Sequence, residues 1–430
     1  MRIAITSDLY YPMSNGVAVF AHNLAKGLAK QGHEVMVLCP SFKGRHYRMK
    51  RDGVTTIYLR SIRFPFYPDQ INAIPEGKKI LKKVSVPRLA YRHGLWITVD
   101  PYPELKKALN KFQPDVIHNQ TAEMVAFAAR RYAKKYNVPM VSTGHAYPDN
   151  ITSQVKLLKP IKKPLDAVLR TYMASFLKHS EYATMPTEMA IEDLVPKNRR
   201  RFSVTVEPLS NGVDLSQFNP GKPKLKVLKH YHLDTKVPRV LFVGRIDPEK
   251  SLSNIVHAFA GVLEKVPNAE LVIVGDGTDR RHLIDLAEAL GITENVKFPG
   301  RIMPPDVVEI YHSATVFATA SETETQGIVL IEAAATGLPL VAVDAGAVRE
   351  LCQNKKNGIL CQPRDISGLT DALVKILQSE ELQEKYGAYS LEVAKKHDLN
   401  HTLKRFVEIY EEAIQLKGKK VSQKRRFWRR

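Results

Sequence analysis

Short apolar segments alternate with amphipathic helical segments along the second half of the chain. Segments of strand length lie at 239–244, 271–275, 295–298, 315–318 and 339–343. Helical patterns lie at 251–265, 279–290, 304–312, 328–336 and 366–377. A strand joined through a helix to the next strand is typical of a parallel, doubly wound sheet. The alternation therefore predicts an α/β domain whose loops meet at the carboxyl edge of its sheet.

The first half repeats the pattern. A strand at 2–6, a loop with Gly16, a helix at 17–31 and a strand at 34–39 form a βαβ unit, and a hairpin-like region at 43–63 follows. Since 430 residues suffice for two domains, we expect two Rossmann-like domains with a central cleft between them. The expected division is a first domain at 1–205, a second at 206–398, a helix at 399–416 that crosses back to the first domain, and a basic tail at 417–430.

The net charge of +20 calls for a polyanionic partner, which is nucleic acid, anionic lipid or a phosphorylated substrate. Basic residues cluster at 43–51, at 78–92 and in the tail, where Phe427 and Trp428 lie among arginines. Basic residues mixed with aromatics favour an anionic membrane surface, although the tail also fits a disordered, solubilising end. Recognisable nucleic-acid-binding motifs are lacking, so we expect no nucleic acid partner.

Two further segments bear on membrane contact. The segment at 63–96 places Phe64, Phe66 and Tyr67 before a lysine-rich helical stretch at 76–84, which is a candidate for partial insertion into lipid. A helix at 160–180 carries an apolar face that we expect to pack in the core; that face holds Leu165, Val168, Leu169, Tyr172, Met173 and Phe176. The cysteines make neither a metal spacing nor a disulfide framework, and no signal peptide is recognised, which favours a reducing compartment.

The segment 321–335, SETETQGIVLIEAAA, combines an anion-binding signal with two carboxylates. Polar turn residues precede an apolar run that can begin a helix at about Gly327, and the first amides of a helix attract phosphate. Glu324 lies on the loop and Glu332 on the helix, and carboxylates accept hydrogen bonds from sugar hydroxyls. Together these features suit a nucleotide sugar, although the segment alone equally fits two solvated glutamates.

Residues that suit a nucleotide sugar also follow other predicted strands. Arg245 and Lys250 follow one strand and can neutralise a diphosphate. A glycine turn around Gly275 and the segment FPGRIMP around Arg301 follow the next two strands. In the first half, His145 lies just past a strand end, where open α/β sheets place their sites. Gly16 allows either an ordinary turn or a close approach to a ligand.

These segments resemble one family. GRIDPEKS, IVGDGTDR, FPGR and ETETQGIVLIEAAATGLPLVA are similar to the donor domain of retaining glycosyltransferases of family four, which have the GT-B fold. NGVD, DLYYPMSNGV, GHEVMV, PDVIH and TGH match the same family, so the resemblance covers nearly the whole chain. The expected fold class is therefore α/β of the GT-B type, and the expected activity is transfer of a hexose with retention, without metal or other cofactor.

The resemblance also implies roles. Arg245 and Lys250 would hold the donor diphosphate, and Glu324 would contact the hexose. Glu332 would bind the ribose hydroxyls. The remaining implied contacts are Gln326, Gly327 and Ile328 with sugar and phosphate through their amides, Arg301 and Ile302 with the base, Gly16 with the diphosphate, and His145 with the hexose at the reaction centre.

One departure from the family pattern narrows the choice of acceptor substrate. Gln326 stands where many members have Phe, and TETQG and RSIRFPFYPDQINAIP are similar to bacterial diacylglycerol glucosyltransferases, whereas AYPDNI after His145 departs from them. The resemblance implies a peripheral enzyme at the cytoplasmic face of the membrane that moves glucose from UDP-glucose to diacylglycerol. The alternatives are a GDP-mannose-dependent transferase acting on phosphatidylinositol, a transferase acting on a soluble sugar, and an inactive sugar-nucleotide binder. The sequence does not indicate an oligomeric state.

Overall fold

The chain divides into two compact units. Unit 1 comprises Met1–Asn211 and Asn400–Arg430, and unit 2 comprises Gly212–Leu399. The computed structural model describes residues 1–11, 15–63, 70–71, 92–93, 96–145, 162–195, 202, 204–234 and 236–427. The aromatic and lysine-rich positions 64–67 and 76–84, the segment AYPDNI and Trp428 lie outside these residues.

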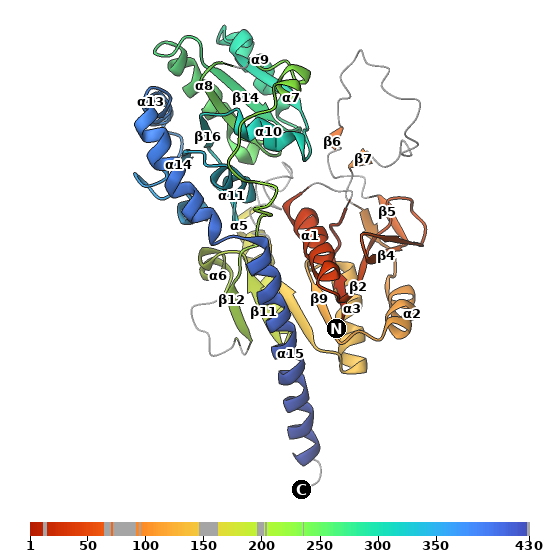
Figure 1. The fold of residues 1–430 in the computed structure, drawn as a ribbon. Helices are drawn as coiled ribbons and strands as arrows, with labels where there is room; N and C mark the ends of the chain where they lie inside the picture. Colours follow the sequence, from red (N-terminus) through yellow and green to blue (C-terminus); the bar gives the residue numbers. More distant parts are fainter. Residues whose placement is uncertain are drawn as a thin grey trace. The chain divides into compact units, whose positions relative to one another are not determined.

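Unit 1 is built on a mostly parallel sheet (Figure 1). Its described residues form eight strands in the order β12-β11-β10-β9-β1-β2-β4-β3. The region expected as a hairpin supplies β3 and β4, which pair antiparallel, and β4 also pairs in parallel with β2. The strands are β1 (Arg2–Thr6), β2 (Glu34–Pro40), β3 (Tyr47–Arg51), β4 (Val54–Leu59), β9 (Val116–Asn119), β10 (Met140–Thr143), β11 (Tyr182–Met185) and β12 (Thr205–Pro208).

Helices and two small strand pairs complete the described part of unit 1. The helices are α1 (Gly16–Lys30), α2 (Tyr102–Phe112), α3 (Met124–Tyr136), α5 (Lys162–Lys178), α6 (Glu188–Leu194) and α15 (Leu399–Phe427). The antiparallel pairs are β5 (Ser61–Arg63) with β8 (Trp96–Thr98), and β6 (Gln70–Ile71) with β7 (Arg92–His93). Because β12 pairs with β11, the expected domain boundary between residues 205 and 206 falls within β12.

Helix α1 follows directly from its sequence. The Asn15 side chain caps it by accepting a hydrogen bond from the Ala18 amide at 2.8 Å. Its buried positions recur every three or four residues and include Phe20 and Leu24, which is the spacing of a helix with one face in a core. Gly27 lets α15 approach closely, because a Cβ there would lie 2.5 Å from a methyl carbon of Leu403. Thus α15, distant in sequence, packs against α1.

Helix α5 buries less of its apolar face than expected. Ala174, Phe176 and Leu177 are buried, but Val168 is 65% exposed and Tyr172 is 37% exposed. The expectation that Val168 and Tyr172 pack in the core is therefore wrong. The C-terminal turns of α5 supply its buried contacts, whereas the positions at 167–168 and 171–172 are exposed.

Unit 2 has a parallel sheet in the order β15-β14-β13-β16-β17-β18. In chain order this is 3-2-1-4-5-6, the doubly wound arrangement that the alternation predicts. Its described strands are β13 (Arg239–Val243), β14 (Glu270–Val274), β15 (Val296–Gly300), β16 (Val316–Thr319), β17 (Leu340–Val343) and β18 (Gly358–Cys361). Its α-helices are α7 (Leu225–His230), α8 (Leu252–Leu263), α9 (Arg280–Ala289), α10 (Asp306–His312), α11 (Ile328–Ala335), α12 (Val348–Leu351), α13 (Ile366–Leu377) and α14 (Glu380–Lys395).

The two faces of the unit 2 sheet have separate apolar cores. One cluster packs residues of α8, α9 and α13, such as Phe259 and Leu373, against the sheet. The other packs α10, α11 and α14, with Tyr311 and Phe317 among its largest side chains. Burial on both faces explains why these strands read as short continuous apolar runs rather than alternating ones.

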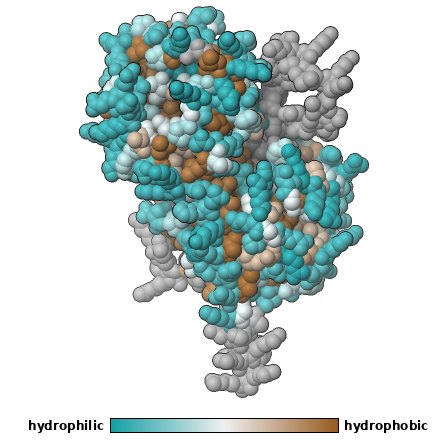
Figure 2. Space-filling model, in the orientation of Figure 1, coloured by the Kyte–Doolittle hydropathy of each residue, from teal (hydrophilic) through white to brown (hydrophobic). Residues whose placement is uncertain are grey.

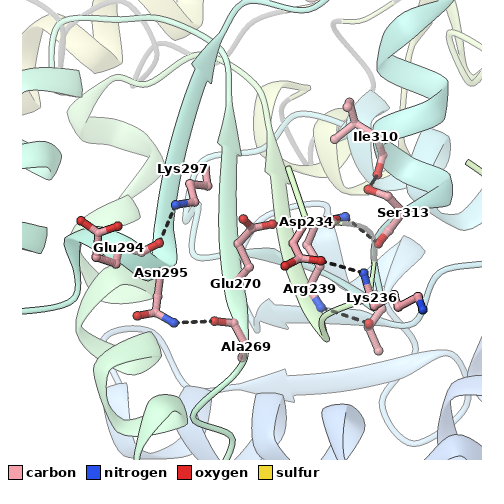
Figure 3. A network of polar contacts seen from close by, with 11 residues as sticks. Asp234, Lys236, Arg239, Ala269, Glu270, Glu294, Asn295, Lys297, Ile310 and Ser313 are labelled. Carbon is pink, nitrogen blue, oxygen red and sulfur yellow. Dashed lines mark hydrogen bonds and ion pairs between the residues drawn. The ribbon is translucent and has the colours of Figure 1, made fainter. Parts of the chain in front are cut away.

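A buried ion pair joins the amino ends of β13 and β14. Arg239 is 1% exposed, and its Nε donates to Glu270 at 2.8 Å. Its other guanidinium nitrogens donate to the carbonyl oxygens of Ser313 and Asp234, and Figure 3 shows this group together. Removing two charges from water costs several kcal/mol per ion unless every donor finds a partner. Here the Arg239 guanidinium has several hydrogen-bond partners, so the ion pair can hold the amino ends of β13 and β14 together.

None of the described helices is both long enough and apolar enough to cross a membrane. Nor does the described part of the chain hold a group of three or more His, Cys, Asp or Glu side chains that could bind a metal ion. On the face shown in Figure 2, hydrophilic side chains cover most of the described surface, with smaller hydrophobic areas between them.

Candidate active site

Three of the predicted site residues of unit 2 lie at the point where its sheet changes winding direction. Strands β13 and β16 are neighbours, yet the chain leaves β13 towards β14 and leaves β16 towards β17. The loops that follow such strands diverge and open a crevice at the carboxyl edge of the sheet, which is where open α/β sheets bind ligands. Arg245 and Lys250 follow β13, and Glu324 follows β16.

Glycines let the loops after β13, β14 and β15 approach one another. The Gly244 amide donates to the Val274 carbonyl at 3.0 Å, and the Gly275 amide donates to the Gly300 carbonyl at 3.0 Å. A Cβ at Gly275 would lie 1.8 Å from the Gly244 oxygen, and the φ of Gly275 is +142°, which L side chains rarely adopt. Only glycine therefore fits at position 275.

Acidic side chains of its own loop hold Arg245. The guanidinium forms ion pairs with Asp247 and Glu249. Asp247 in turn accepts hydrogen bonds from the amide and hydroxyl of Thr278, at 2.9 and 3.0 Å. The loops after β13 and β14 therefore form one bonded unit that fixes the position of the arginine.

Lys250 and Glu324 join the two loops across the switch point. Lys250 Nζ donates to Glu324 Oε1 at 2.6 Å, and each side chain is 15% exposed. Burial raises the pKa of Glu324, but the charge and hydrogen bond of Lys250 outweigh that effect, with help from Ser321 and Arg245, so its pKa is lowered. Glu324 is therefore an ionised acceptor near neutral pH.

The turn before α11 aims the first amides of that helix. Gly327 has a φ of +82° and precedes the first helical residue, Ile328. The Glu324 carbonyl accepts from the Ala347 amide at 3.1 Å, which fixes the loop from outside. Gln326 is only 3% exposed, so its side chain forms part of the packed base of the loop.

Glu332 lies more than one turn along α11, in a different environment. The Tyr311 hydroxyl donates to its Oε2 at 2.7 Å. Burial raises the pKa of Glu332 to about 7, against the opposing effect of the Tyr311 hydrogen bond. This carboxyl group is therefore poised between its two protonation states near neutral pH.

Arg301 and Ile302 follow β15. Burial lowers the pKa of Arg301, and Asp276 partly offsets that effect. Ile302 is 5% exposed and packs in the core with Val274 and Val307, so only its backbone is available to a ligand.

In unit 1, His145 and Gly16 come from different elements. His145 follows β10, and its Nε2 contacts Gln120 Oε1 at 2.8 Å. Its ring lies 5.1 Å from the ring of Phe20, and burial lowers its pKa to about 3, so it is neutral. Gly16 is exposed at the first position of α1.

The structure adds polar residues that sequence patterns did not single out. Asp8, two residues past the end of β1, accepts hydrogen bonds from the Thr121 hydroxyl and the Val125 amide, both at 3.1 Å. Burial, and then the charge of Glu123, raise the pKa of Asp8 to about 8. Gln120 could have been found from its place directly after a strand, as His145 was. Tyr311 carries no such local signal, and neither does Tyr410, whose hydroxyl contacts His118 Nδ1 at 2.8 Å.

Comparisons with known proteins agree with this architecture. A model of glycosyl transferases group 1 matches residues 226–393, and a model of Glycosyltransferase Family 4 matches residues 14–217. Sucrose-phosphate synthase from Thermosynechococcus elongatus superposes with a TM-score of 0.73 at 18% identity, over 96% of this chain and 99% of that one. With two Rossmann-like units, the fold is GT-B.

Two relatives extend the similarity along the chain. Alpha-monoglucosyldiacylglycerol synthase of Streptococcus pneumoniae is 27% identical over 408 residues, which cover 91% of this chain and 83% of that protein. Phosphatidyl-myo-inositol mannosyltransferase of Mycobacterium leprae is 33% identical over 429 residues, which cover 98% of this chain and 99% of that protein. This chain belongs to glycosyltransferase family four.

Proposed function

We propose that this protein transfers a hexose from a nucleotide sugar to a membrane lipid, with glucose from UDP-glucose and 1,2-diacylglycerol as the preferred pair. The observation that carries the donor part is the Lys250–Glu324 pair of 2.6 Å, which links the loops after β13 and β16 next to the start of α11. That arrangement sets cations and helix amides, which suit a diphosphate, beside a carboxylate that suits sugar hydroxyls.

Each site residue then has a task. Arg245 and Lys250 bind the diphosphate and stabilise it as the leaving group. Glu324 accepts hydrogen bonds from the hexose, and the amides of Gln326, Gly327 and Ile328 contact sugar and phosphate. Glu332 binds the ribose hydroxyls. The remaining contacts are those of Arg301 and the Ile302 backbone with the base, of Gly16 with the diphosphate and of His145 with the hexose.

Transfer proceeds with retention and without a metal ion. The sugar–phosphate bond breaks as the acceptor hydroxyl attacks from the same face, and the departing diphosphate takes the hydroxyl proton. Arg245, Lys250 and the positive end of α11 offset the charge that develops on the diphosphate. Glu324 and Glu332 are ligands in this scheme and do not act as the acid and base of a glycosidase.

Replacement of the paired residues tests the site. Glu324→Ala and Lys250→Ala should each lower kcat/KM for sugar transfer by about 100-fold or more, because each removes a charged contact to the reacting part of the donor. Glu322→Ala is the matched control, since Glu322 lies on the same loop and pairs instead with Arg364 at 3.2 Å. Transfer rates of both site variants within about threefold of the unchanged protein would remove the site assignment.

A lipid acceptor is supported by both relatives, since one is a monoglucosyldiacylglycerol synthase and the other is a phosphatidyl-myo-inositol mannosyltransferase. In this chain the outermost strand, β3, is exposed and carries Arg48, Lys50 and Arg51. Nearby, Lys43 lies 4.8 Å from the ring of Tyr47. Such a basic and aromatic surface suits the anionic cytoplasmic face of a membrane, where we place the protein as a peripheral enzyme.

Vesicle flotation tests membrane binding. The protein should float with vesicles of phosphatidylcholine and phosphatidylglycerol and much less with phosphatidylcholine alone. Reversing the charge of Lys43, Arg48 and Lys50 by substitution with Glu should weaken binding about 100-fold or more, since each basic residue contributes about 1 kcal/mol near the surface. The control is a triple variant in which the exposed Lys375, Lys385 and Lys396 of unit 2 are replaced by Glu. If both triple variants weakened binding equally, or if the protein bound neither kind of vesicle, the proposal that this surface binds the membrane would be wrong.

The second candidate is a GDP-mannose-dependent mannosyltransferase acting on phosphatidylinositol, which the 33% identical relative favours. Assays that combine UDP-glucose or GDP-mannose with diacylglycerol or phosphatidylinositol vesicles decide between the two. A glucosylated diacylglycerol supports the first candidate, and a mannosylated phosphatidylinositol supports the second. A product formed only with a soluble sugar acceptor would reject both.

A further inference from the structure

We infer that Gln120, His118 and Tyr410 are positioning residues that fix the tautomer and orientation of the His145 ring. The inference rests on the proposed function for the task of His145 at the hexose. The hydrogen-bonded chain from the C-terminal helix to that ring does not depend on the function.

The chain of contacts runs through three elements of unit 1. His145, just past β10, contacts Gln120 Oε1 through its Nε2 at 2.8 Å. Gln120 Nε2 contacts His118 Nε2 at 3.1 Å, and His118 Nδ1 contacts the Tyr410 hydroxyl at 2.8 Å. Gln120 is 1% exposed, and His118 and Tyr410 are fully buried. The network is therefore shielded from water up to His145.

The amide of Gln120 assigns opposite roles to the two histidines. An amide has one accepting end and one donating end, and a neutral imidazole likewise has one of each. The Gln120 oxygen accepts from the protonated Nε2 of His145, which leaves Nδ1 of His145 as an acceptor. The Gln120 nitrogen donates to the bare Nε2 of His118, so His118 donates from Nδ1 to the Tyr410 oxygen.

Both histidines are held neutral, as this pattern needs. Burial lowers the pKa of His145 to about 3. Burial, followed by the charge of His145, lowers the pKa of His118 to about 3. Thr143 adds a contact of 2.7 Å from its hydroxyl to His118 Nε2, and it contacts the Thr184 hydroxyl at 2.7 Å. Both ring nitrogens of His118 and both polar atoms of the Gln120 amide therefore have a partner in this network.

Aromatic packing fixes the ring planes. The Phe20 ring lies 5.1 Å from His145, and the Phe406 ring lies 5.0 Å from His118. Phe20 and Phe406 are themselves 6.0 Å apart. Phe406 and Tyr410 lie one turn apart on α15, so one face of that helix supplies both the packing and the terminal hydroxyl. The C-terminal helix thereby holds a residue that follows β10.

Nitrogen NMR of the His145 ring tests the network directly. In protein labelled with 15N-histidine, Nε2 of His145 should show the shift of a protonated nitrogen and Nδ1 that of a bare one. Signals are assigned by their loss in His145→Gln. Gln120→Leu should mix the two tautomers and lower kcat about ten- to 100-fold with little change in KM for the donor. Gln120→Glu keeps an acceptor for the Nε2 proton and should retain the tautomer.

Tyr410→Phe provides a second variant that keeps the packed ring and deletes only the hydroxyl. It should broaden or shift the His118 and His145 signals, whereas Tyr132→Phe, a buried tyrosine of the same unit, should leave them unchanged. His145 signals that stay the same in both Gln120→Leu and Tyr410→Phe would overturn the inference. Absence of transfer by the unchanged protein with every donor would reject the proposed function, and the NMR result would still decide the network.

Discussion

Two glutamates of one short segment show how the environment of each residue sets its chemistry. Lys250 keeps the pKa of Glu324 below its usual value despite burial. Among the described residues no cation lowers the pKa of Glu332, and burial raises that pKa to about 7. Near neutral pH the first is a fixed negative charge, and the second gains or loses a proton in response to small changes in its contacts. The two carboxylates therefore suit different ligand groups.

Removal of the Tyr311 hydroxyl should make nucleotide binding more dependent on pH. Its hydrogen bond lowers the pKa of Glu332, so Tyr311→Phe should raise that pKa above about 7. At pH 7 a larger fraction of Glu332 is then protonated, and we expect UDP or GDP to bind about three- to tenfold more weakly. Near pH 9 the carboxyl is ionised in both proteins, so the difference should shrink.

Titration calorimetry at pH 6, 7 and 9 measures this dependence. The control is Tyr389→Phe, which deletes a hydroxyl of unit 2 that donates to Gln353 instead, at 2.9 Å. A loss of affinity that is the same at all three pH values would show that Tyr311 acts through packing alone.

At the scale of elements, the site depends on loops that touch at one sheet edge. The loops after β13, β14 and β15 exchange backbone hydrogen bonds, and glycines make that contact possible. The loop after β16 is fixed from its other side by the Ala347 amide. Since these loops precede α8, α9, α10 and α11, their geometry sets the direction in which the first turns of those helices point.

Gly275→Ala should separate the loops after β13 and β14. Its methyl group would meet the Gly244 oxygen at 1.8 Å, so the backbone must move. We expect a loss of more than about 2 kcal/mol of unfolding free energy, and nucleotide affinity about tenfold weaker. Gly291→Ala is the control, because its φ is also positive but nothing lies within 4 Å of the added methyl group. Gly291→Ala should lower the unfolding free energy by only about 1 kcal/mol. Urea denaturation measures both variants, and an equal loss of unfolding free energy in the two would contradict a role for the Gly275–Gly244 contact.

For the whole molecule, the two units differ in how their chains are assembled. Unit 2 is continuous, and both of its apolar clusters draw only on residues between 213 and 394. Unit 1 takes its last helix from the other end of the chain, and α15 buries Phe406, Ile409, Tyr410 and Ala413. Arg405 of that helix pairs with Glu207 on β12 at 2.7 Å. Unit 1 is therefore completed only after unit 2 has been synthesised.

Separate production of the units tests this division. Residues 212–399 alone should unfold cooperatively and bind nucleotide, because their core is self-contained. Residues 1–211 alone should lack a cooperative transition, since α15 is missing from the core. Joining 1–211 to 400–430 by a short Gly/Ser linker should restore one, because the Thr402 hydroxyl donates to the Ser210 carbonyl at 2.9 Å and the two ends therefore lie close together. A cooperative transition in 1–211 alone would contradict this dependence on α15.

The fold class and the placement of most loops could be predicted because they depend on local patterns. Alternating apolar and helical segments define βα units, and parallel strands bring the loops that follow them to one edge. β18 was missed, because four residues after a polar turn give little local signal. Val168 and Tyr172 were misplaced, because helical periodicity shows that a face is apolar and does not show what covers it.

The sequence by itself determined the order of strands and helices, the glycines that allow close loops, and the cations and carboxylates at the strand ends. These features are local, since each depends on residues within a few positions of one another. The tertiary structure alone decided that Lys250 pairs with Glu324, that Tyr311 bonds Glu332, and that Tyr410 bonds His118 from 292 positions away. Such contacts, and the pKa directions that follow from them, depend on burial and distance, which arise only when remote segments pack together.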